Sequence, residues 1–141
     1  LEFTDELLEL AATGDVICPH FHIPLQSGSD RILAKMQRPY TTVEYAELLA
    51  RIRKRLPEAA IAADVMTGFP GETEQDHQTA LEFIAGCNFA GIHVFPYSRR
   101  SGTPAADMPD QVPKNVKAAR VRDILRIGKE SRRRYIERFL G

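Results

Sequence analysis

Residues 61–73 read IAADVMTGFPGET and carry the clearest fold signal of the sequence. Ile61–Phe69 is an apolar run with the length of a buried strand. A Pro-Gly turn follows, and then Thr73, a helix N-cap with Asp76 at the capping-box distance. The helix that Thr73 opens places apolar side chains toward a core before Gly86. A strand that leads through a tight turn into a helix is typical of the α/β class.

Two further apolar runs flank this unit, and helical patterns separate all three. The runs are Phe21–Leu25 (FHIPL) and Gly91–Tyr97 (GIHVFPY). The 3.6-residue apolar period and the start signals predict further helices at Phe3–Ala12, Ser29–Met36, Thr41–Leu56 and Pro113–Phe139. We therefore expect three parallel strands that alternate with helices through right-handed crossovers. Three strands are few for a sheet with this many helices.

Composition describes an ordinary globular chain. Of its 141 residues 43% are apolar and 27% charged, and Lys+Arg equals Asp+Glu at 19 each, so bulk charge does not indicate a nucleic-acid partner. Lys114–Arg138 is nevertheless rich in basic residues, which predicts either a phosphate contact or a solvated helix face. The two cysteines, Cys18 and Cys87, lie far apart without a secretory leader, and no apolar run could span a bilayer. We expect a cytoplasmic protein without a membrane segment.

Polar and glycine-rich residues follow each expected strand. They are Gln26–Ser29, Gly68–Glu72 and Pro96–Arg100. Because functional side chains of parallel sheets collect at the carboxyl ends of strands, we expect these turns to form one rim. A plainer interpretation stays open, in which Ser29 or Asp30 only caps a helix and residues 68–73 only form a turn. Asp64 is harder to explain structurally, because a carboxylate inside a buried strand needs a partner or a ligand.

Three histidines lie on or beside the strands. His20 and His22 share one face of their strand, and His93 lies on another strand. Two imidazoles without a nearby carboxylate or thiolate set make a poor zinc site, so the pattern favours core or rim histidines and we predict no metal site. His77 lies in a helix and is expected at the surface. Nucleophile-elbow, Walker, Rossmann and Cys-cluster motifs are absent from the sequence, so it contains no complete catalytic apparatus.

Four ordered segments resemble the later motifs of the radical S-adenosylmethionine (SAM) methylthiotransferases. They are residues 18–30 (CPHFHIPLQSGSD), 36–41 (MQRPYT), 64–73 (DVMTGFPGET) and 93–105 (HVFPYSRRSGTPA). The resemblance covers essentially the whole chain. Within the family, the segments are most similar to the branch that acts on N6-threonylcarbamoyladenosine 37 of tRNA, and they differ from the isopentenyladenosine and ribosomal-protein branches.

The resemblance implies that residues 1–141 are half of a partial (β/α)6 radical SAM barrel, with strands four to six and their flanking helices. In this family a three-Cys motif after the first strand holds a 4Fe-4S cluster that cleaves SAM, and that motif is missing here. An N-terminal domain with a second 4Fe-4S cluster and a C-terminal RNA-binding domain are also expected outside this chain. Leu1 would then lie in the helix before strand four, and Gly141 near the join to the RNA-binding domain.

The resemblance also implies roles for individual residues. A SAM-facing wall with two polar contacts would consist of Gln26, Ser27, Gly68, Phe95 and Tyr97, together with Arg38 and Asp64. The fifth-strand stretch departs from the family pattern Gly-x-Ile-x-Gly-x-x-Glu, because Asp64, Met66 and Gly71 occupy three of its named places and Glu72 comes one residue late. Arg99 and Arg100 are candidates for RNA contact.

These expectations concern a parent enzyme more than the chain itself. The parent would add a methylthio group at C2 of the modified adenosine, whereas the chain alone is predicted to be inactive because it lacks the cluster ligands. One alternative is a non-catalytic module that binds SAM or RNA, and another is a methylthiotransferase acting on isopentenyladenosine. Half a barrel would also expose the edge of its first strand, which predicts a homodimer.

Overall fold

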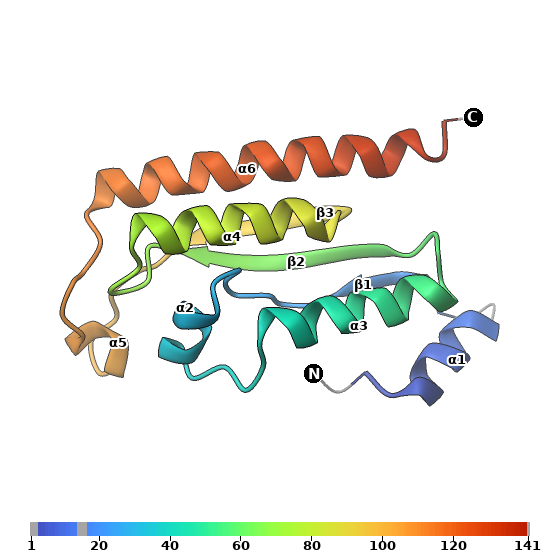
Figure 1. Ribbon diagram of the computed structural model, residues 1–141, viewed down its shortest axis with the longest axis horizontal. Helices are drawn as coiled ribbons and strands as arrows, with labels where there is room; N and C mark the ends of the chain where they lie inside the picture. Colours follow the sequence, from blue (N-terminus) through green and yellow to red (C-terminus); the bar gives the residue numbers. More distant parts are fainter. Residues whose placement is uncertain (1–2, 14–16, 141) are drawn as a thin grey trace.

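The computed structural model describes residues 3–13 and 17–140, so Leu1 and Gly141 lie outside the described residues. The elements, in chain order, are α1 (Asp5–Thr13), β1 (His20–His22), α2 (Asp30–Lys35), α3 (Thr42–Arg55), β2 (Ala60–Thr67), α4 (Glu74–Cys87), β3 (Gly91–Pro96), α5 (Pro104–Asp107) and α6 (Lys114–Glu137) (Figure 1). The predicted alternation of strands and helices is confirmed. The short helix α5 was not predicted.

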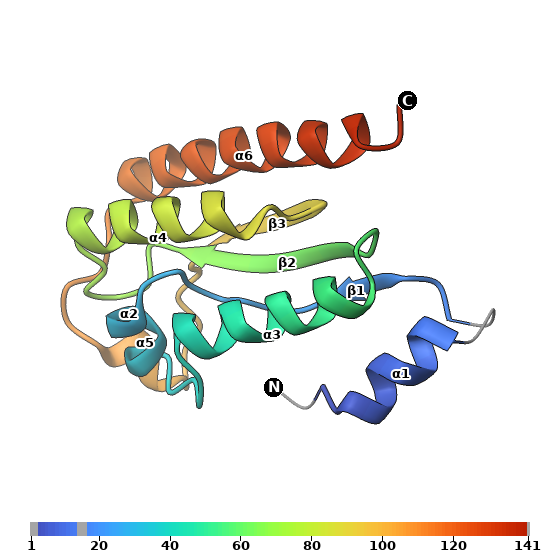
Figure 2. The ribbon, with the colours of Figure 1, turned by 45° about the vertical axis from the view of Figure 1, so that its right-hand side comes forward.

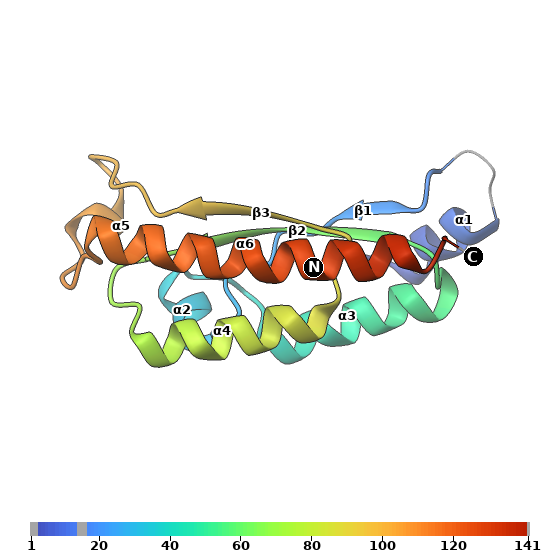
Figure 3. The same ribbon diagram turned by 90° about the horizontal axis from the view of Figure 1, so that it is seen from above.

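The three strands form one parallel sheet in the order β1-β2-β3. In the register, His22 is the partner of Ala62 and Asp64 is the partner of His93. Helices α3 and α4 lie on one side of this sheet, and no described helix lies across the other side (Figure 3). The long helix α6 runs beside β3 and α4 (Figure 2). This arrangement agrees with part of a radical SAM barrel, and it leaves one face of the sheet open.

The covered face of the sheet carries the main core. Side chains alternate along each strand, so one set points toward the helices and the other toward the open face. Each fully buried aliphatic side chain contributes about 1.5–3 kcal/mol to folding. Tyr45 of α3 is fully buried, and its hydroxyl donates to the carbonyl of Ile23 over 2.6 Å. Other members of this core are Phe21, Leu25, Leu49, Ile52, Ile61, Ala63, Val65, Ile84 and Phe89.

β1 is shorter than the predicted strand Phe21–Leu25, and it begins one residue earlier. The chain continues beside β2 after His22, where the N–H of Ile23 donates to the carbonyl of Ala62 over 2.8 Å and the N–H of Leu25 donates to that of Asp64 over 3.1 Å. Pro24 lies between these two donors, so its missing N–H faces away from β2 and the pairing with β2 loses no hydrogen bond. The prediction was therefore right about the place of the strand and wrong about its extent.

The turn after β2 forms as predicted. Thr73 caps α4 by accepting a hydrogen bond from the N–H of Asp76, and the carboxylate of Asp76 accepts from the N–H of Thr73. Asp76 is also bound by Arg31 of α2, so the helices α2 and α4 are joined through this cap. None of the described helices is both long enough and apolar enough to cross a membrane.

Candidate functional site

The open face of the sheet carries polar side chains from each of the three strands. Its members are His20 and His22 on β1, Ala60, Ala62, Asp64 and Met66 on β2, and Gly91, His93 and Phe95 on β3. From the amino to the carboxyl end, this face presents small and histidine side chains, then a carboxylate, and then Met66 beside Phe95. The sequence patterns alone did not reveal that these side chains share one surface.

Asp64 lies between two imidazoles at the centre of this face. Its Oδ1 is 2.9 Å from Nε2 of His22 and 3.3 Å from Nδ1 of His93. The centroids of the two imidazole rings are 5.3 Å apart. The side chains of His22, Asp64 and His93 are 38%, 28% and 62% exposed, so solvent reaches all three. The expectation that Asp64 needs a partner is met by these two histidines.

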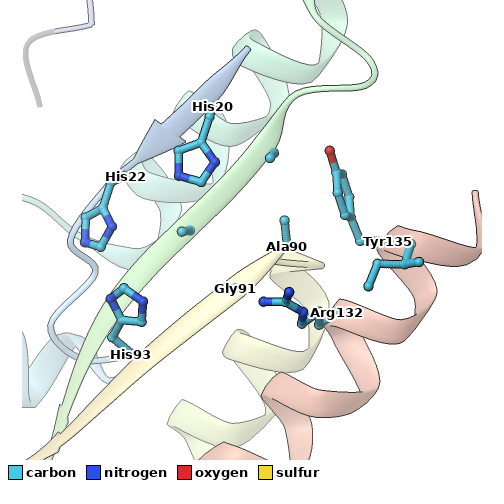
Figure 4. A pocket seen from close by; sticks show the side chains of 10 residues that line it. His20, His22, Ala90, Gly91, His93, Arg132 and Tyr135 are labelled. Carbon is cyan, nitrogen blue, oxygen red and sulfur yellow. The ribbon is translucent and has the colours of Figure 1, made fainter. Parts of the chain in front are cut away.

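A hollow of about 370 Å³ opens beside the histidines, toward the amino end of the sheet. Figure 4 shows His20, His22 and His93 on the strands, facing a space that Arg132 and Tyr135 of α6 border from the other side. Tyr135 is fixed there because its hydroxyl donates to the carbonyl of Glu58 over 2.9 Å. Helix α6 therefore borders the open face of the sheet on one side.

Gln26 and Ser27 occupy the carboxyl end of the segment that follows β1. Gln26 adopts a left-handed conformation with φ 67°, its N–H donates to the carbonyl of Asp64, and its carbonyl accepts from Met66 N, each over 2.8 Å. The Gln26 side chain is partly exposed. Ser27 is only 3% exposed, and its hydroxyl accepts from the N–H of Ser29 over 3.2 Å. Ser27 thus stabilises the turn before α2.

Gly68 directly follows β2 and adopts a left-handed conformation with φ 74°. A Cβ on this residue would lie 2.2 Å from Cγ of Lys117, so the aliphatic chain of Lys117 occupies the space that a side chain would need. The N–H of Gly68 donates to Glu72 over 3.0 Å, and Arg120 of α6 donates to the same carboxylate over 2.8 Å. The displaced Glu72 of the family pattern therefore holds the turn against α6.

Phe95 and Tyr97 lie at the end of β3 in different environments. Phe95 is 52% exposed on the open face. Tyr97 is buried, its ring packs edge-to-face on Phe69 with centroids 5.5 Å apart, and its carbonyl accepts from Nζ of Lys117 over 2.9 Å. Among the described residues the hydroxyl of Tyr97 has no hydrogen-bond partner.

Three predicted arginines lie at the carboxyl edge of the sheet. Arg38 lines a hollow of about 220 Å³ together with Met66, which is the register partner of Phe95. Arg99 and Arg100 follow β3 and are exposed. The structure thus brings Arg38 close to the exposed apolar end of the open face, and it places Arg99 and Arg100 on the loop beyond that end.

The basic helix α6 divides its charges between two roles. Arg120 is buried and pairs with Glu72, and Lys117 is partly buried against Gly68 and Tyr97, so both stabilise the fold. The exposed basic residues Arg122, Arg126, Lys129 and Arg133 recur at intervals of three or four and share one face of the helix. We call this face the α6 basic face.

His77 was expected at the surface, and that prediction is wrong. Its side chain is 2% exposed, and Nε2 lies 3.2 Å from Oδ2 of Asp123 on α6. The residue lies on the side of α4 that meets α6, and this contact was not readable from the helix pattern because it depends on where α6 returns.

The chain is similar to radical SAM proteins and to tRNA-methylthiolating enzymes. Residues 1–84 match the Radical SAM superfamily profile. The tRNA-2-methylthio-N(6)-dimethylallyladenosine synthase of Mycolicibacterium smegmatis is 47% identical over 126 residues, which are 89% of this chain and 25% of that protein. The threonylcarbamoyladenosine tRNA methylthiotransferase MtaB of Bacillus subtilis is 43% identical over 138 residues, which are 98% of this chain and 31% of that protein. The chain spans about a quarter to a third of these relatives.

Proposed function

Because the chain belongs to the Radical SAM superfamily, we propose that it is the later half of the radical SAM core of a longer tRNA methylthiotransferase. The observation that carries this proposal is the similarity to methylthiolating enzymes over 89% and 98% of the chain. The four resembling segments support it, since they lie at or beside the three parallel strands. The N-terminal cluster domain and the C-terminal RNA-binding domain would belong to the remainder of that protein.

The open face suits one wall of a SAM site. Phe95 presents an exposed apolar ring for an adenine, Gln26 presents a partly exposed amide, and Arg38 presents a guanidinium for a carboxylate. We propose Asp64 as a further polar contact and the backbone at Ser27, Gly68 and Tyr97 as the frame of this wall. When bound beside a reduced 4Fe-4S cluster, SAM supplies the radical that removes the hydrogen from C2 of the adenosine.

The residues of this chain do not fit a 4Fe-4S cluster. Such clusters are held by several cysteine thiolates, and the sequence has only Cys18 and Cys87. Cys18 is exposed before β1, whereas Cys87 is buried at the end of α4. We therefore propose that both clusters of the parent bind outside this chain, and that the chain alone does not cleave SAM.

Two N6-modified adenosines are candidate substrates. We favour N6-threonylcarbamoyladenosine 37, because its carboxylate would suit the exposed Arg99 and Arg100 and because the Bacillus subtilis relative matches 98% of the chain. The dimethylallyl (isopentenyl) form is the second candidate. It is favoured by the 47% identity to the Mycolicibacterium smegmatis synthase.

Nucleoside analysis tests the proposed function and separates the two substrates. The gene of the parent protein would be deleted in its source organism, and digested tRNA would be analysed by liquid chromatography and mass spectrometry. We expect the 2-methylthio derivative of threonylcarbamoyladenosine to disappear while its unmethylthiolated precursor accumulates. Loss of the dimethylallyl derivative instead would support the second candidate. If both derivatives are unchanged, the proposed function is wrong.

The α6 basic face is a candidate contact for tRNA phosphates, because Arg122, Arg126 and Lys129 lie together on it. The alternative to a part of an enzyme is a module that only binds RNA. A titration of the chain with tRNA at rising salt concentration tests whether α6 contacts the phosphates. A steep loss of affinity with salt supports the contact, and no binding at low salt removes it. A cytoplasmic location would follow from a tRNA substrate.

Self-association of the chain also stays a prediction. Within the described residues, β1 pairs with β2 on one side only, so its other edge offers free backbone groups. A dimer would pair or cover this edge. Light scattering at high protein concentration checks the dimer, and a strictly monomeric species would contradict it.

A further inference from the structure

We propose that His22, Asp64 and His93 form a binding site for one divalent transition-metal ion of the zinc type. The three side chains come from three neighbouring strands and meet on the open face of the sheet. Their ligand atoms all lie within 4.8 Å of one another. In residues 3–13 and 17–140 this is the one such group of three His, Cys, Asp or Glu side chains. This metal site is additional to the proposed methylthio transfer, and its ligands differ from those of an iron-sulfur cluster.

The distances suit a metal centre. Ligand atoms about 2.0–2.1 Å from a tetrahedral zinc ion are separated from one another by about 3.4 Å. The observed separations from Oδ1 of Asp64 are 2.9 Å to His22 and 3.3 Å to His93. Small rotations of side chains that are partly exposed would therefore complete the geometry. The parallel register sets this convergence, because it places Asp64 beside His93 and two residues beyond the partner of His22.

The ligand types identify the class of ion. Two imidazole nitrogens and one carboxylate oxygen suit zinc, cobalt and related ions, whereas magnesium and calcium prefer oxygen-only sets. Three protein ligands also leave a coordination position for water or for another oxygen ligand. There is space for this further ligand, since His22, His93 and Arg132 all line the 370 Å³ hollow (Figure 4). An anionic oxygen bound to the metal could thus also face the Arg132 guanidinium.

His20 provides a matched control on the same strand. It is exposed, lies on the same face as His22 and lines the same hollow, but it does not belong to the convergent group. Replacing His20 removes an imidazole of the same kind from nearly the same place. A metal held by the three proposed ligands should not respond to this change, whereas adventitious binding by exposed histidines should.

The test is a titration of the full 141-residue chain, free of any histidine tag, with Co²⁺ under visible absorption and then with Zn²⁺ as competitor. We expect one equivalent of Co²⁺ to produce saturable d–d bands that Zn²⁺ removes. His22→Ala, His93→Ala and Asp64→Asn should each weaken binding by at least about tenfold, and His20→Ala should bind as the unchanged chain does. Far-UV circular dichroism confirms that each variant is folded.

The opposite results overturn the proposal. A chain that gives no saturable cobalt band does not contain the site. The three ligand variants could bind the ion as tightly as the unchanged chain, or His20→Ala could lose as much affinity as they do. Either result would show that exposed histidines bind the ion without a defined site. Because the readout needs neither SAM nor tRNA, its failure is distinguishable from failure of the proposed enzymatic function.

Discussion

The guanidinium of Arg120 donates to the carboxylate of Glu72 over 2.8 Å, where α6 meets the turn after β2. Both side chains are almost fully buried, at 7% and 5% exposed. Glu72 also accepts from the N–H of Gly68 and from the hydroxyl of Thr67. The pair therefore ties the last helix of the chain to the strand end that frames the candidate SAM wall.

Replacing Arg120 by alanine should strongly destabilise the fold. The change leaves the Glu72 carboxylate buried without its cation, and breaking a buried pair in this way costs about 3–5 kcal/mol. Urea unfolding followed by circular dichroism measures the loss. Arg122→Ala on the exposed face of the same helix is the control, with an expected change within about 0.5 kcal/mol. Similar stabilities for both variants would show that the pair contributes little.

Two glycine substitutions should change the free energy of unfolding in opposite directions. Gly68→Ala should lower the free energy of unfolding by about 1–3 kcal/mol, because φ is 74° and the new Cβ would overlap Lys117. Gly86 lies inside α4, and a Cβ there would contact nothing within 4 Å. Gly86→Ala should therefore raise stability by about 0.5–1 kcal/mol. Thermal unfolding compares the two, and a loss at both positions would contradict the packing described for Gly86.

The stability of the chain should fall in acid partly through Asp76. Arg31 above all, and then the hydrogen bonds from Thr73 and Ser29, hold the pKa of Asp76 well below its ordinary value. A lowered pKa in the folded state stabilises the fold above the unfolded pKa of about 3.9, and this stabilisation is lost as pH falls toward the folded pKa. Asp76→Asn should cost about 2 kcal/mol at pH 7.

The same variant gives a pH test. Between about pH 5 and pH 2, the free energy of unfolding of Asp76→Asn should fall less steeply than that of the unchanged chain. Urea titrations at a series of pH values measure both slopes. Parallel curves would mean that Asp76 does not couple folding to protonation.

The two cysteines should differ in reactivity. Burial raises the pKa of Cys87 to about 12, so almost no thiolate forms there near pH 8. Cys18 is exposed. Ellman's reagent should therefore modify one thiol in the folded chain and two in denaturant, and Cys18→Ser should remove the fast reaction. Rapid modification of both thiols in the folded state would contradict the burial of Cys87.

The order of the elements was readable from the sequence because it depends on local signals. The cap at Thr73, the Pro-Gly turn and the apolar periods place β2 and α4 within one or two residues of the predicted bounds. The short helix α5 was missed, since four residues are too few to show a helical period. The end of β1 was also misplaced, because the chain after His22 keeps hydrogen bonds to β2 without forming a regular strand.

The candidate site was only partly readable, because it depends on how the strands align. The sequence marked Asp64 as a carboxylate that needs a partner, and it placed His22 and His93 on strands. It could not give the register, and the carboxylate that makes two histidines a plausible metal site comes from the strand between them. The burial of His77 and Arg120 could not be predicted either, since it depends on where α6 packs against the rest of the chain.

The formation of 5′-deoxyadenosine from SAM shows whether this chain is one half of a radical SAM core whose cluster binds elsewhere. The purified chain and the longer parent protein would be reconstituted with iron and sulfide, reduced and assayed side by side. We expect the parent to produce 5′-deoxyadenosine and the chain to produce none. Product from the chain alone would show that the chain holds a cluster itself, and no product from a parent that holds its clusters would show that the parent is not a radical SAM enzyme.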